Sequence, residues 1–441
     1  MSRELLLSLL EADLQQLQLV KINGRIVQVV GLVAESQGPD VRVGDLCRIC
    51  FRDGSHSLDA EVVGFREDRV LLMPLGDLRE VGPGCDVIST SRPLEVAVGD
   101  GLLGRVLNAL GEPIDDKGPL VATDFYPLYA SPPHPLKRQL VDRPLSVGVG
   151  VIDGMLTLGM GQRIGIFAGS GVGKSTLLGM MARYTTADIN VISLVGERGR
   201  EVREFIERDL GPEGLKRSVL VVATSDQPPL LRLKAALTAT AVAEYFRDEG
   251  KNVLLMMDSV TRVARAQREI GLAIGEPPAT RGYTPSVFEM LPSLLERAGA
   301  GEVGSITGIY TVLVEGDDMN EPVADTVRGV LDGHVVLSRK IAARNFYPAV
   351  SVLESVSRVM PAVVSEEHLM AAGRIRNLLA TYAESEDLIN IGAYKTGSNA
   401  RVDWALEHLG SVRSFLSQKV DESRSYEETV EHILTLAPEP A

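Results

Sequence analysis

The chain has 441 residues, and its 45% hydrophobic content is ample for the buried cores of about three domains. Its 45 Lys and Arg against 59 Asp and Glu give a formal net charge of −14, which argues against a broad, sequence-independent grip on nucleic acid. No apolar run reaches the roughly 18 residues that span a bilayer. The leucine-rich start, Leu5 to Leu19, contains Glu11 and Asp13 and lacks a cleavage-like site, so we expect no signal peptide and a cytoplasmic location.

The first segment, residues 1–20, is predicted to be an amphipathic helix. A helix over residues 2–19 separates a leucine stripe from the polar residues Glu11, Asp13 and Gln16. Such a stripe needs a partner surface, which is either the helix's own domain or another protein. The stripe consists of Leu6, Leu9, Leu10, Leu14 and Leu17.

The next segment, residues 21–93, is predicted to form a small closed β-barrel. Short β-rich stretches alternate here with turn signals, among them Gly-Pro at 38–39 and Gly-Pro-Gly at 82–84. This spacing is typical of a small barrel. We expect strands over residues 26–34, 43–51, 60–65, 70–74 and 85–89.

The three cysteines do not indicate a metal or disulfide framework. Cys47 and Cys50 form a lone C-x-x-C inside a predicted strand, where residues three apart point to opposite faces. No second pair completes a zinc site. With Cys85 the number is odd, so we expect ordinary core or surface thiols.

Residues 94–360 are predicted to form an α/β domain with a mostly parallel sheet. A proline-rich passage, 123–145, is expected to be extended and laid over this domain. From about 150 onward apolar strands alternate with helical patterns, which implies a sheet covered on both faces. The expected strands are 163–168, 189–195, 219–223, 252–258, 305–314 and 333–338. Residues 361–441 lose the β signal, and we expect a small helical domain there.

A strand, a glycine-rich turn and a helix start follow one another from Arg163 to Thr176. The turn predicts a P-loop for ATP, because glycines let successive N–H groups point at the phosphates. Lys174 adds a mobile positive charge, and Ser175 offers a hydroxyl to Mg²⁺. Ala168 stands where the P-loop motif usually has its leading glycine. The alternative to a P-loop is a glycine-rich turn that merely joins a strand to a helix. The predicted nucleotide-binding residues are Ala168, Gly169, Ser170, Gly171, Val172, Gly173, Lys174, Ser175 and Thr176.

Two further carboxylates follow apolar strands of the same domain. Asp258 ends the strand 252–258, and we expect it to hold the Mg²⁺ shell opposite Ser175. Glu197 follows the strand 189–195, where a general base for the attacking water belongs. Arg198 beside it braces this carboxylate or stabilises phosphate charge. The alternatives are a strand-ending structural aspartate and a solvated Glu-Arg turn.

Four stretches of the sequence together resemble the type III protein export ATPases, relatives of the rotary ATP synthase catalytic subunits. The order of β-barrel, RecA-like ATPase core and helical tail is the same, and the resemblance covers nearly the whole chain. Gly392-Ala393-Tyr394-Lys395-x-Gly397 is more similar to the flagellar branch than to the virulence injectisome branch. The four stretches are residues 165–175, 196–201, 275–283 and 356–360.

The resemblance implies two roles that spacing does not give. Tyr347 matches the aromatic residue that stacks on adenine, although a core tyrosine before a proline turn is the alternative. Arg358 matches the arginine finger that reaches the triphosphate of the neighbouring subunit. Because Glu197 and Arg358 occur in one chain, we expect a homohexamer with interfacial sites. Ser351 replaces the aspartate usual near the finger loop, which removes a negative charge there.

The resemblance also implies partners. The loop Gly275 to Pro278 is expected to line the pore and contact a coiled-coil stalk protein, unless it is an ordinary connection. The N-terminal leucine stripe is expected to dock a regulatory export protein. Export substrates and their chaperones are further expected partners, and the membrane export gate is an indirect one, at the cytoplasmic face of the secretion apparatus.

Several functions remain open at this point. The leading interpretation is ATP hydrolysis coupled to delivery or unfolding of export substrates, in the flagellar or the injectisome branch. A rotary catalytic subunit shares the chemistry, but the pairing of Glu197 with Arg358 in one chain argues against a mixed ring. A hexameric RNA translocase shares the core, but the acidic balance and the lack of an aromatic and basic strand face in residues 24–91 count against it.

Overall fold

The structure is a computed structural model and describes residues 23–51 and 56–436. The predicted leucine-striped helix over residues 2–19 lies outside the described residues. Contacts divide the chain into two compact units. The first is the N-terminal part up to Leu94 with Ala273–Gly275, and the second is Glu95–Leu272 with the chain from Glu276 onward.

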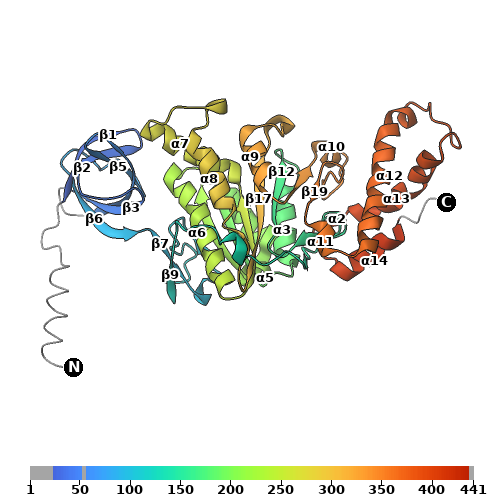
Figure 1. Cartoon of the computed structure of the whole chain (residues 1–441), viewed down its shortest axis with the longest axis horizontal. Coiled ribbons are helices and arrows are strands. Elements are labelled where there is room, and N and C mark those ends of the chain that lie inside the picture. The colour runs from blue at the N-terminus through green and yellow to red at the C-terminus, as the bar shows by residue number, and fades with distance from the viewer. Residues whose placement is uncertain (1–22, 52–55, 437–441) are drawn as a thin grey trace, which may run out of the picture. The chain divides into compact units, whose positions relative to one another are not determined.

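The first unit is a closed six-stranded barrel, which confirms the predicted barrel (Figure 1). Its core is built from inward-facing apolar residues such as Ile49, Val62 and Leu72. One predicted strand, 26–34, is wrong in detail, because Gly31 adopts a left-handed φ of 58° and turns the chain into a hairpin. The strands are joined in the order β1-β2-β5-β4-β3-β6. They are β1 (Gly24–Val30), β2 (Val33–Gln37), β3 (Asp45–Cys50), β4 (Ser57–Arg66), β5 (Arg69–Pro74) and β6 (Asp86–Pro93).

The cysteines belong to the barrel. Cys47 and Cys85 are buried in its core, and Cys50 is half-buried. Burial raises the pKa of Cys47 to about 11, which keeps it a neutral thiol. Among the described residues no group of three or more His, Cys, Asp or Glu side chains is arranged to hold a metal ion.

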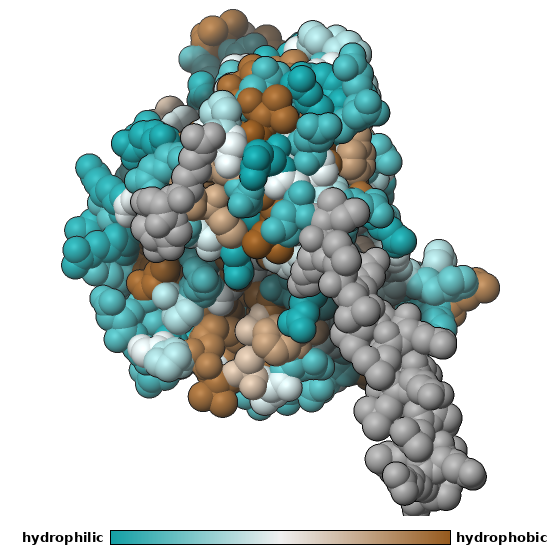
Figure 2. All heavy atoms as spheres, turned by 90° about the vertical axis from the view of Figure 1, so that its left-hand side faces the viewer, coloured by the Kyte–Doolittle hydropathy of each residue, from teal (hydrophilic) through white to brown (hydrophobic). Residues whose placement is uncertain are grey.

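The barrel's outer surface is largely polar. Figure 2 looks at the molecule from the left-hand side of Figure 1, and its visible surface is mostly hydrophilic with hydrophobic side chains in small separate groups. Single exposed apolar residues of this kind are normal for a folded domain. In the barrel they are Val27, Val30, Leu32, Val43 and Phe65.

The second unit contains a nine-stranded sheet whose central strands are parallel, as predicted. The order is β19-β18-β12-β17-β15-β13-β14-β8, with β16 (Gly299–Ala300) antiparallel to β17. The six predicted strands are β12 (Arg163–Ala168), β13 (Ile189–Glu197), β14 (Ser218–Thr224), β15 (Asn252–Asp258), β17 (Ser305–Leu313) and β18 (Gly333–Leu337). Short strands not predicted as part of this sheet are β8 (Val106–Leu107), β16 and the antiparallel β19 (Val356–Ser357).

Helices cover both faces of the sheet, with α3 (Lys174–Tyr184) and α6 (Pro229–Asp248) on opposite sides (Figure 1). The strands are buried along almost their whole length, as expected where both faces are covered. The other helices of this region are α2 (Gly150–Met155), α4 (Gly199–Glu204), α5 (Gly211–Lys216), α7 (Val260–Ile274), α8 (Pro285–Leu295), α9 (Pro322–Val330) and α10 (Arg339–Ala342).

The proline-rich passage is mainly irregular, as its composition predicts. It contains two short strands, β9 (Asp124–Pro127) and β10 (Pro144–Leu145). β9 pairs antiparallel with β7 (Glu95–Val98), and β10 pairs antiparallel with β11 (Leu158–Gly159). Proline is compatible with such edge positions because they require no complete ladder of N–H donors.

The C-terminal part is helical, as predicted. The helices α12 (Glu366–Asn390) and α13 (Ala400–Leu416) pack against each other, and α14 (Tyr426–Leu436) packs on α2. The short α11 (Met360–Val363) precedes them. In the part of the chain that the structure describes, no helix has the length and apolarity to cross a membrane.

Candidate nucleotide-binding site

The predicted P-loop joins the end of β12 to the start of α3. Gly171 and Gly173 adopt φ values of 80° and 85°, a region that side chains other than glycine rarely occupy. Val172 between them is buried and anchors the loop in the core. The helix begins at Lys174, two residues before the predicted start, so Lys174 and the exposed Ser175 belong to its first turn. The loop amides therefore converge at a helix N-terminus, a geometry suited to anions.

The strand order brings Lys174 next to the two predicted carboxylates. Its Nζ contacts Oδ1 of Asp258 and lies 3.9 Å from Oε1 of Glu197. Both carboxylates are buried, with exposed fractions of 4% and 8% respectively. Thr311 on β17 donates a 2.7 Å hydrogen bond to the same Asp258 oxygen. One cation and two carboxylates from three separate strand ends thus share one buried cluster.

The surroundings of Glu197 differ from the expectation that Arg198 braces its carboxylate. Glu197 is the last residue of β13, behind an irregularity in the strand register. Arg198 points away: its side chain is 80% exposed and pairs with Glu201 at 3.6 Å. The brace on Glu197 comes instead from Arg262, whose Nη1 lies 3.1 Å from Oε2 and also donates to the Gly196 carbonyl oxygen. The predicted role of Arg198 at the phosphate stays a prediction.

The sequence analysis missed Arg262 because it lies 65 positions after Glu197 in the chain. A signal was nevertheless present. Arg262 follows Asp258 by four residues, in the first turn of α7, and the start of this helix lies beside the end of β13 since β13 and β15 are neighbours. A basic residue one turn after a strand-ending carboxylate is therefore a candidate for the same site.

The surroundings of Glu197 change its proton affinity. Burial, a hydrogen bond with Glu201 and the charge of Asp258 raise the pKa of Glu197 to about 7, against the opposing effect of Lys174 and Arg262. A carboxylate with a pKa near neutrality exchanges protons readily at physiological pH, which is what a general base needs.

Tyr347 lies against the phosphate loop, beside a pocket of about 740 Å³. A side chain on Gly173 would come within 3.4 Å of the Tyr347 ring, so the two are in contact distance. The Tyr347 carbonyl oxygen accepts hydrogen bonds from Gln418 N at 3.0 Å and from Ser417 Oγ at 3.2 Å. The connection between α13 and α14 therefore holds this wall of the pocket, a contribution that the sequence analysis did not find. The pocket is lined by Gly171, Gly173, Thr176, Leu177, Met180, Asn345, Tyr347, Pro348 and residues 417–421.

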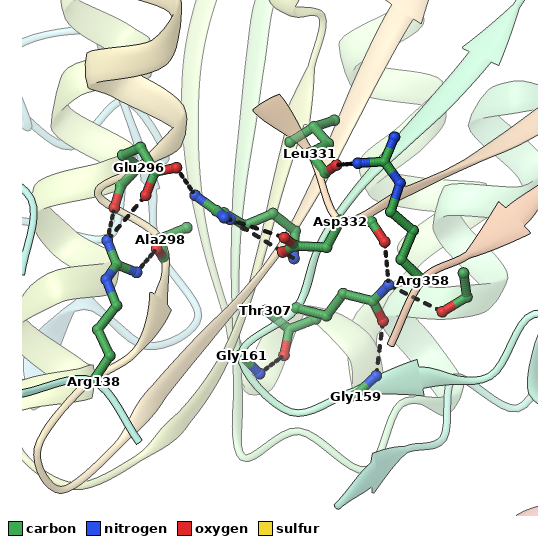
Figure 3. A network of polar contacts seen from close by, with 12 residues as sticks. Arg138, Gly159, Gly161, Glu296, Ala298, Thr307, Leu331, Asp332 and Arg358 are labelled. Atoms are coloured by element: carbon green, nitrogen blue, oxygen red, sulfur yellow. Dashed lines mark hydrogen bonds and ion pairs between the residues drawn. The ribbon is translucent and has the colours of Figure 1, made fainter. Parts of the chain in front are cut away.

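Arg358 lies at the amino ends of the parallel strands, whereas the P-loop lies at their carboxyl ends. These two ends are called the amino edge and the carboxyl edge of the sheet. β18 runs parallel to β12 and pairs Leu337 with Ala168 at the P-loop end, but Gly333, at its start, pairs with Ser357. Four residues of strand correspond to roughly 13 Å. Arg358 is exposed, and its main-chain N–H donates to the Asp332 carbonyl at 3.0 Å. Its Nη1 donates to the Leu331 carbonyl at 3.3 Å (Figure 3).

Two other predicted features lie in loops. Ser351 donates its N–H to the Val336 carbonyl at 2.8 Å, and its own carbonyl accepts from Ser355 Oγ at 2.6 Å. The loop after α7 is exposed from Pro277 to Arg281. Its proposed contact with a stalk stays a prediction.

Family models match three parts of the chain. Residues 26–91 match the beta-barrel domain of the ATP synthase alpha/beta family, and residues 148–357 match its nucleotide-binding domain. Residues 364–435 match the C-terminal domain of the EscN ATPase of type III secretion.

Individual relatives are similar over nearly the whole chain. The flagellum-specific ATP synthase of Bacillus subtilis (strain 168) is 59% identical over 94% of both chains. The type 3 secretion system ATPase of Xanthomonas euvesicatoria is 54% identical over 97% of both. The solved structure of the assembled ATPase EscN in complex with its central stalk EscO, from enteropathogenic E. coli, matches with a TM-score of 0.87 and 47% identity, covering 94% of this chain and 99% of EscN.

Proposed function

The chain belongs to the ATP synthase alpha/beta family, in its branch of flagellar and type III secretion ATPases, and from this we propose how its residues hydrolyse ATP. As an ATPase of a type III protein export apparatus, it takes a nucleoside triphosphate as substrate. We propose that the amides of residues 169–175 cradle the phosphates and that Lys174 neutralises their charge.

A magnesium ion fits the residues at this end of the sheet. The Ser175 hydroxyl and the Asp258 carboxylate are hard oxygen ligands of the kind that Mg²⁺ prefers, and phosphate oxygens and water complete such shells. When bound, the ion supplies charge neutralisation at the phosphates. Asp258 in turn is oriented by the hydrogen bond from Thr311.

Glu197 is the proposed general base. Its raised pKa and its position 3.9 Å from Lys174 support this role, because the base must stand beside the phosphate that water attacks. Arg262 fixes the direction of the carboxylate through its contacts with Oε2 and with the Gly196 carbonyl. Tyr347 is proposed to stack on the adenine, in the pocket that borders the P-loop.

Arg358 is proposed to act on the ATP of a neighbouring subunit. The observation that carries this is its place at the amino edge of the sheet, while the P-loop lies at the carboxyl edge. An exposed arginine at the amino edge is too far from the P-loop of its own chain, so it acts on the ATP bound by a second copy. In a closed ring of identical subunits, each nucleotide site then receives an arginine from its neighbour. The relative EscN is an assembled ATPase, and we propose a homohexamer here.

Mixed rings test this assignment. Arg358→Ala and Glu197→Ala subunits are each expected to be inactive alone. Mixed in equal amounts, about one quarter of the interfaces join an intact Glu197 to an intact Arg358, and ATPase activity should return. If the mixture stays as inactive as its components, Arg358 does not act in trans.

The wider function follows from the family. We propose that ATP hydrolysis drives delivery or unfolding of export substrates at the cytoplasmic face of a flagellar apparatus, with a coiled-coil stalk against the Gly275 to Pro278 loop. The stalk proposal is supported by the complex of EscN with EscO. Restoration of swimming in a strain that lacks its own flagellar export ATPase tests the branch, and failure there with restored injectisome secretion would favour the alternative.

A further inference from the structure

The segment that carries Arg358 is hydrogen-bonded to Gln162, a buried residue directly before β12; these hydrogen bonds are called the clasp. We propose that Gln162 is a positioning residue for Arg358, so that its side chain determines how well this subunit completes the site of its neighbour. This inference rests on the proposed action of Arg358 in trans. Gln162 itself touches neither nucleotide nor phosphate in this proposal.

Gln162 is fully buried, and both the oxygen and the nitrogen of its side-chain amide are hydrogen-bonded. Oε1 accepts a 2.9 Å hydrogen bond from the Gly159 N–H. Nε2 donates to Ser357 Oγ at 3.0 Å and to the Asp332 carbonyl at 3.3 Å. A glutamine amide has two donor hydrogens, and both partners flank Arg358: Ser357 precedes it, and Asp332 accepts its main-chain N–H.

The strand that carries the finger is short enough to need this clasp. β19 has two residues and pairs only through Ser357 with Gly333 and Val356 with His334. Ser357 Oγ, which accepts from Gln162, also donates to the Thr157 carbonyl at 2.9 Å. A two-residue strand supplies little pairing energy of its own, so side-chain hydrogen bonds decide its position.

The other partner of Gln162, Asp332, is held by several contacts with Arg163. Its carboxylate accepts from the Arg163 N–H at 2.9 Å and is paired with the Arg163 guanidinium at 3.1 Å. Its main-chain N–H donates to the Arg163 carbonyl at 2.8 Å. The guanidinium of Arg163 in turn pairs with Glu296. Gln162 therefore connects the segment that carries Arg358 to the Asp332–Arg163 pair.

The direction of Arg358 depends on this main-chain frame. Its guanidinium is exposed and is held by one 3.3 Å hydrogen bond to the Leu331 carbonyl. A shift of about 1 Å in a catalytic group can cost about a hundredfold in rate. A small displacement of residues 357–358 is thus expected to reduce kcat while ATP binding, at the other edge, is retained.

The test variant is Gln162→Met, which keeps the volume and removes both donors. We expect kcat to fall about 10- to 100-fold with KM for ATP within about twofold of the wild type. Ser357→Ala, which removes one of the two partners, should give a smaller loss of the same kind. The matched control is Thr307→Val at the same turn. Thr307 is buried and its Oγ1 accepts from the Gly161 N–H at 2.8 Å. Its hydrogen bond does not involve residues 357–358, so the kcat of this variant should stay near wild type.

Mixed rings separate a finger defect from other defects. Gln162→Met subunits should be rescued by Glu197→Ala subunits, which supply intact fingers, and should not be rescued by Arg358→Ala subunits. Rescue by Arg358→Ala subunits instead would place the defect in the P-loop that β12 carries and would overturn the inference. Rescue by neither, or wild-type kcat in folded Gln162→Met protein, would overturn it as well. The Arg358→Ala plus Glu197→Ala mixture, run in parallel, reports separately whether the finger acts in trans.

Discussion

At the carboxyl edge of the central sheet, Lys174, Glu197 and Asp258 form one buried cluster of opposite charges. At the amino edge Arg358 is exposed, and its hydrogen bonds go to the main-chain carbonyls of Leu331 and Asp332. The buried edge is complete within one chain and fixes charge where a ligand's charge will be placed. In the proposed mechanism, the exposed edge supplies one positive charge to the ATP of a neighbouring subunit. In the proposed mechanism, the carboxyl edge holds the nucleotide and the general base, whereas the amino edge contributes only to the rate in a neighbouring subunit, so variants at the two edges should have different kinetic signatures.

The strongest test of this division is Arg358→Ala. Loss of an arginine finger is expected to lower kcat by about 10³- to 10⁵-fold, because the charge that develops on the phosphate is no longer neutralised. KM and nucleotide affinity should change little, since the carboxyl edge is intact. Steady-state kinetics with equilibrium binding of a fluorescent ATP analogue measures both. A large loss of affinity would place Arg358 in the binding half and break the comparison.

Glu197→Gln is expected to lower kcat by about 10²- to 10⁴-fold while ATP still binds, because the attacking water loses its general base.

The Glu197→Gln variant should also gain folding stability. The pKa of Glu197 is raised by folding from 4.5 to about 7, so the ionised carboxylate disfavours the folded state above pH 7, and this penalty disappears below about pH 4.5. Denaturant unfolding at pH 8 should therefore show a gain of about 1–3 kcal/mol. An unchanged or lower free energy of unfolding would mean that its partners fully compensate the buried charge.

Tyr347→Ala sharpens the comparison from the binding side. Stacking of a base on an aromatic ring contributes about 1–3 kcal/mol, so KM for ATP should rise about tenfold while kcat is largely retained. Tyr347→Phe keeps the ring and is the matched control. Equal KM values for the alanine and phenylalanine variants would remove Tyr347 from the base site.

The smallest expected effects are shifts of the pH profile. Because the base must be unprotonated, kcat/KM should rise as the pH increases through about 7. Glu201→Gln removes a partner that raises the pKa of Glu197, so the rise should move to lower pH. Arg262→Gln removes a positive charge that lowers it, so the rise should move to higher pH. A shift of the pKa of Glu197 by one unit corresponds to a change of up to about tenfold in kcat/KM at pH 6. Shifts in the same direction for both variants would contradict the assignment of Glu197 as the titrating base.

Much of this site was predictable because its main residues lie within or directly beside clear sequence motifs. Lys174 and Ser175 follow a strand and three glycines, and Asp258 ends an apolar strand. The parallel sheet then brings their strand ends together. In the barrel, one continuous β-rich stretch was predicted as a single strand because the turn at Gly31 has no second turn residue beside it.

The remaining residues depend on tertiary contacts that no local pattern contains. Arg262 reaches Glu197, and Gln418 reaches the Tyr347 carbonyl, across 65 and 71 positions of chain. Arg198 was expected to brace Glu197 because it is adjacent, but successive residues of an extended chain point to opposite sides. The clasp of Gln162 on Ser357 joins elements almost two hundred residues apart and had no signal in the sequence.

β12 has one further consequence. It starts beside Gln162, which is hydrogen-bonded to Ser357, and ends at the P-loop. In the proposed ring, one strand of six residues therefore has a neighbour's site at one end and its own at the other. In the proposed homohexamer the subunits are joined head to tail, and each subunit receives an arginine from one neighbour and supplies Arg358 to the other. The assembly therefore has a polarity: a nucleotide bound in one subunit distinguishes its clockwise from its anticlockwise neighbour, even though all the chains are identical.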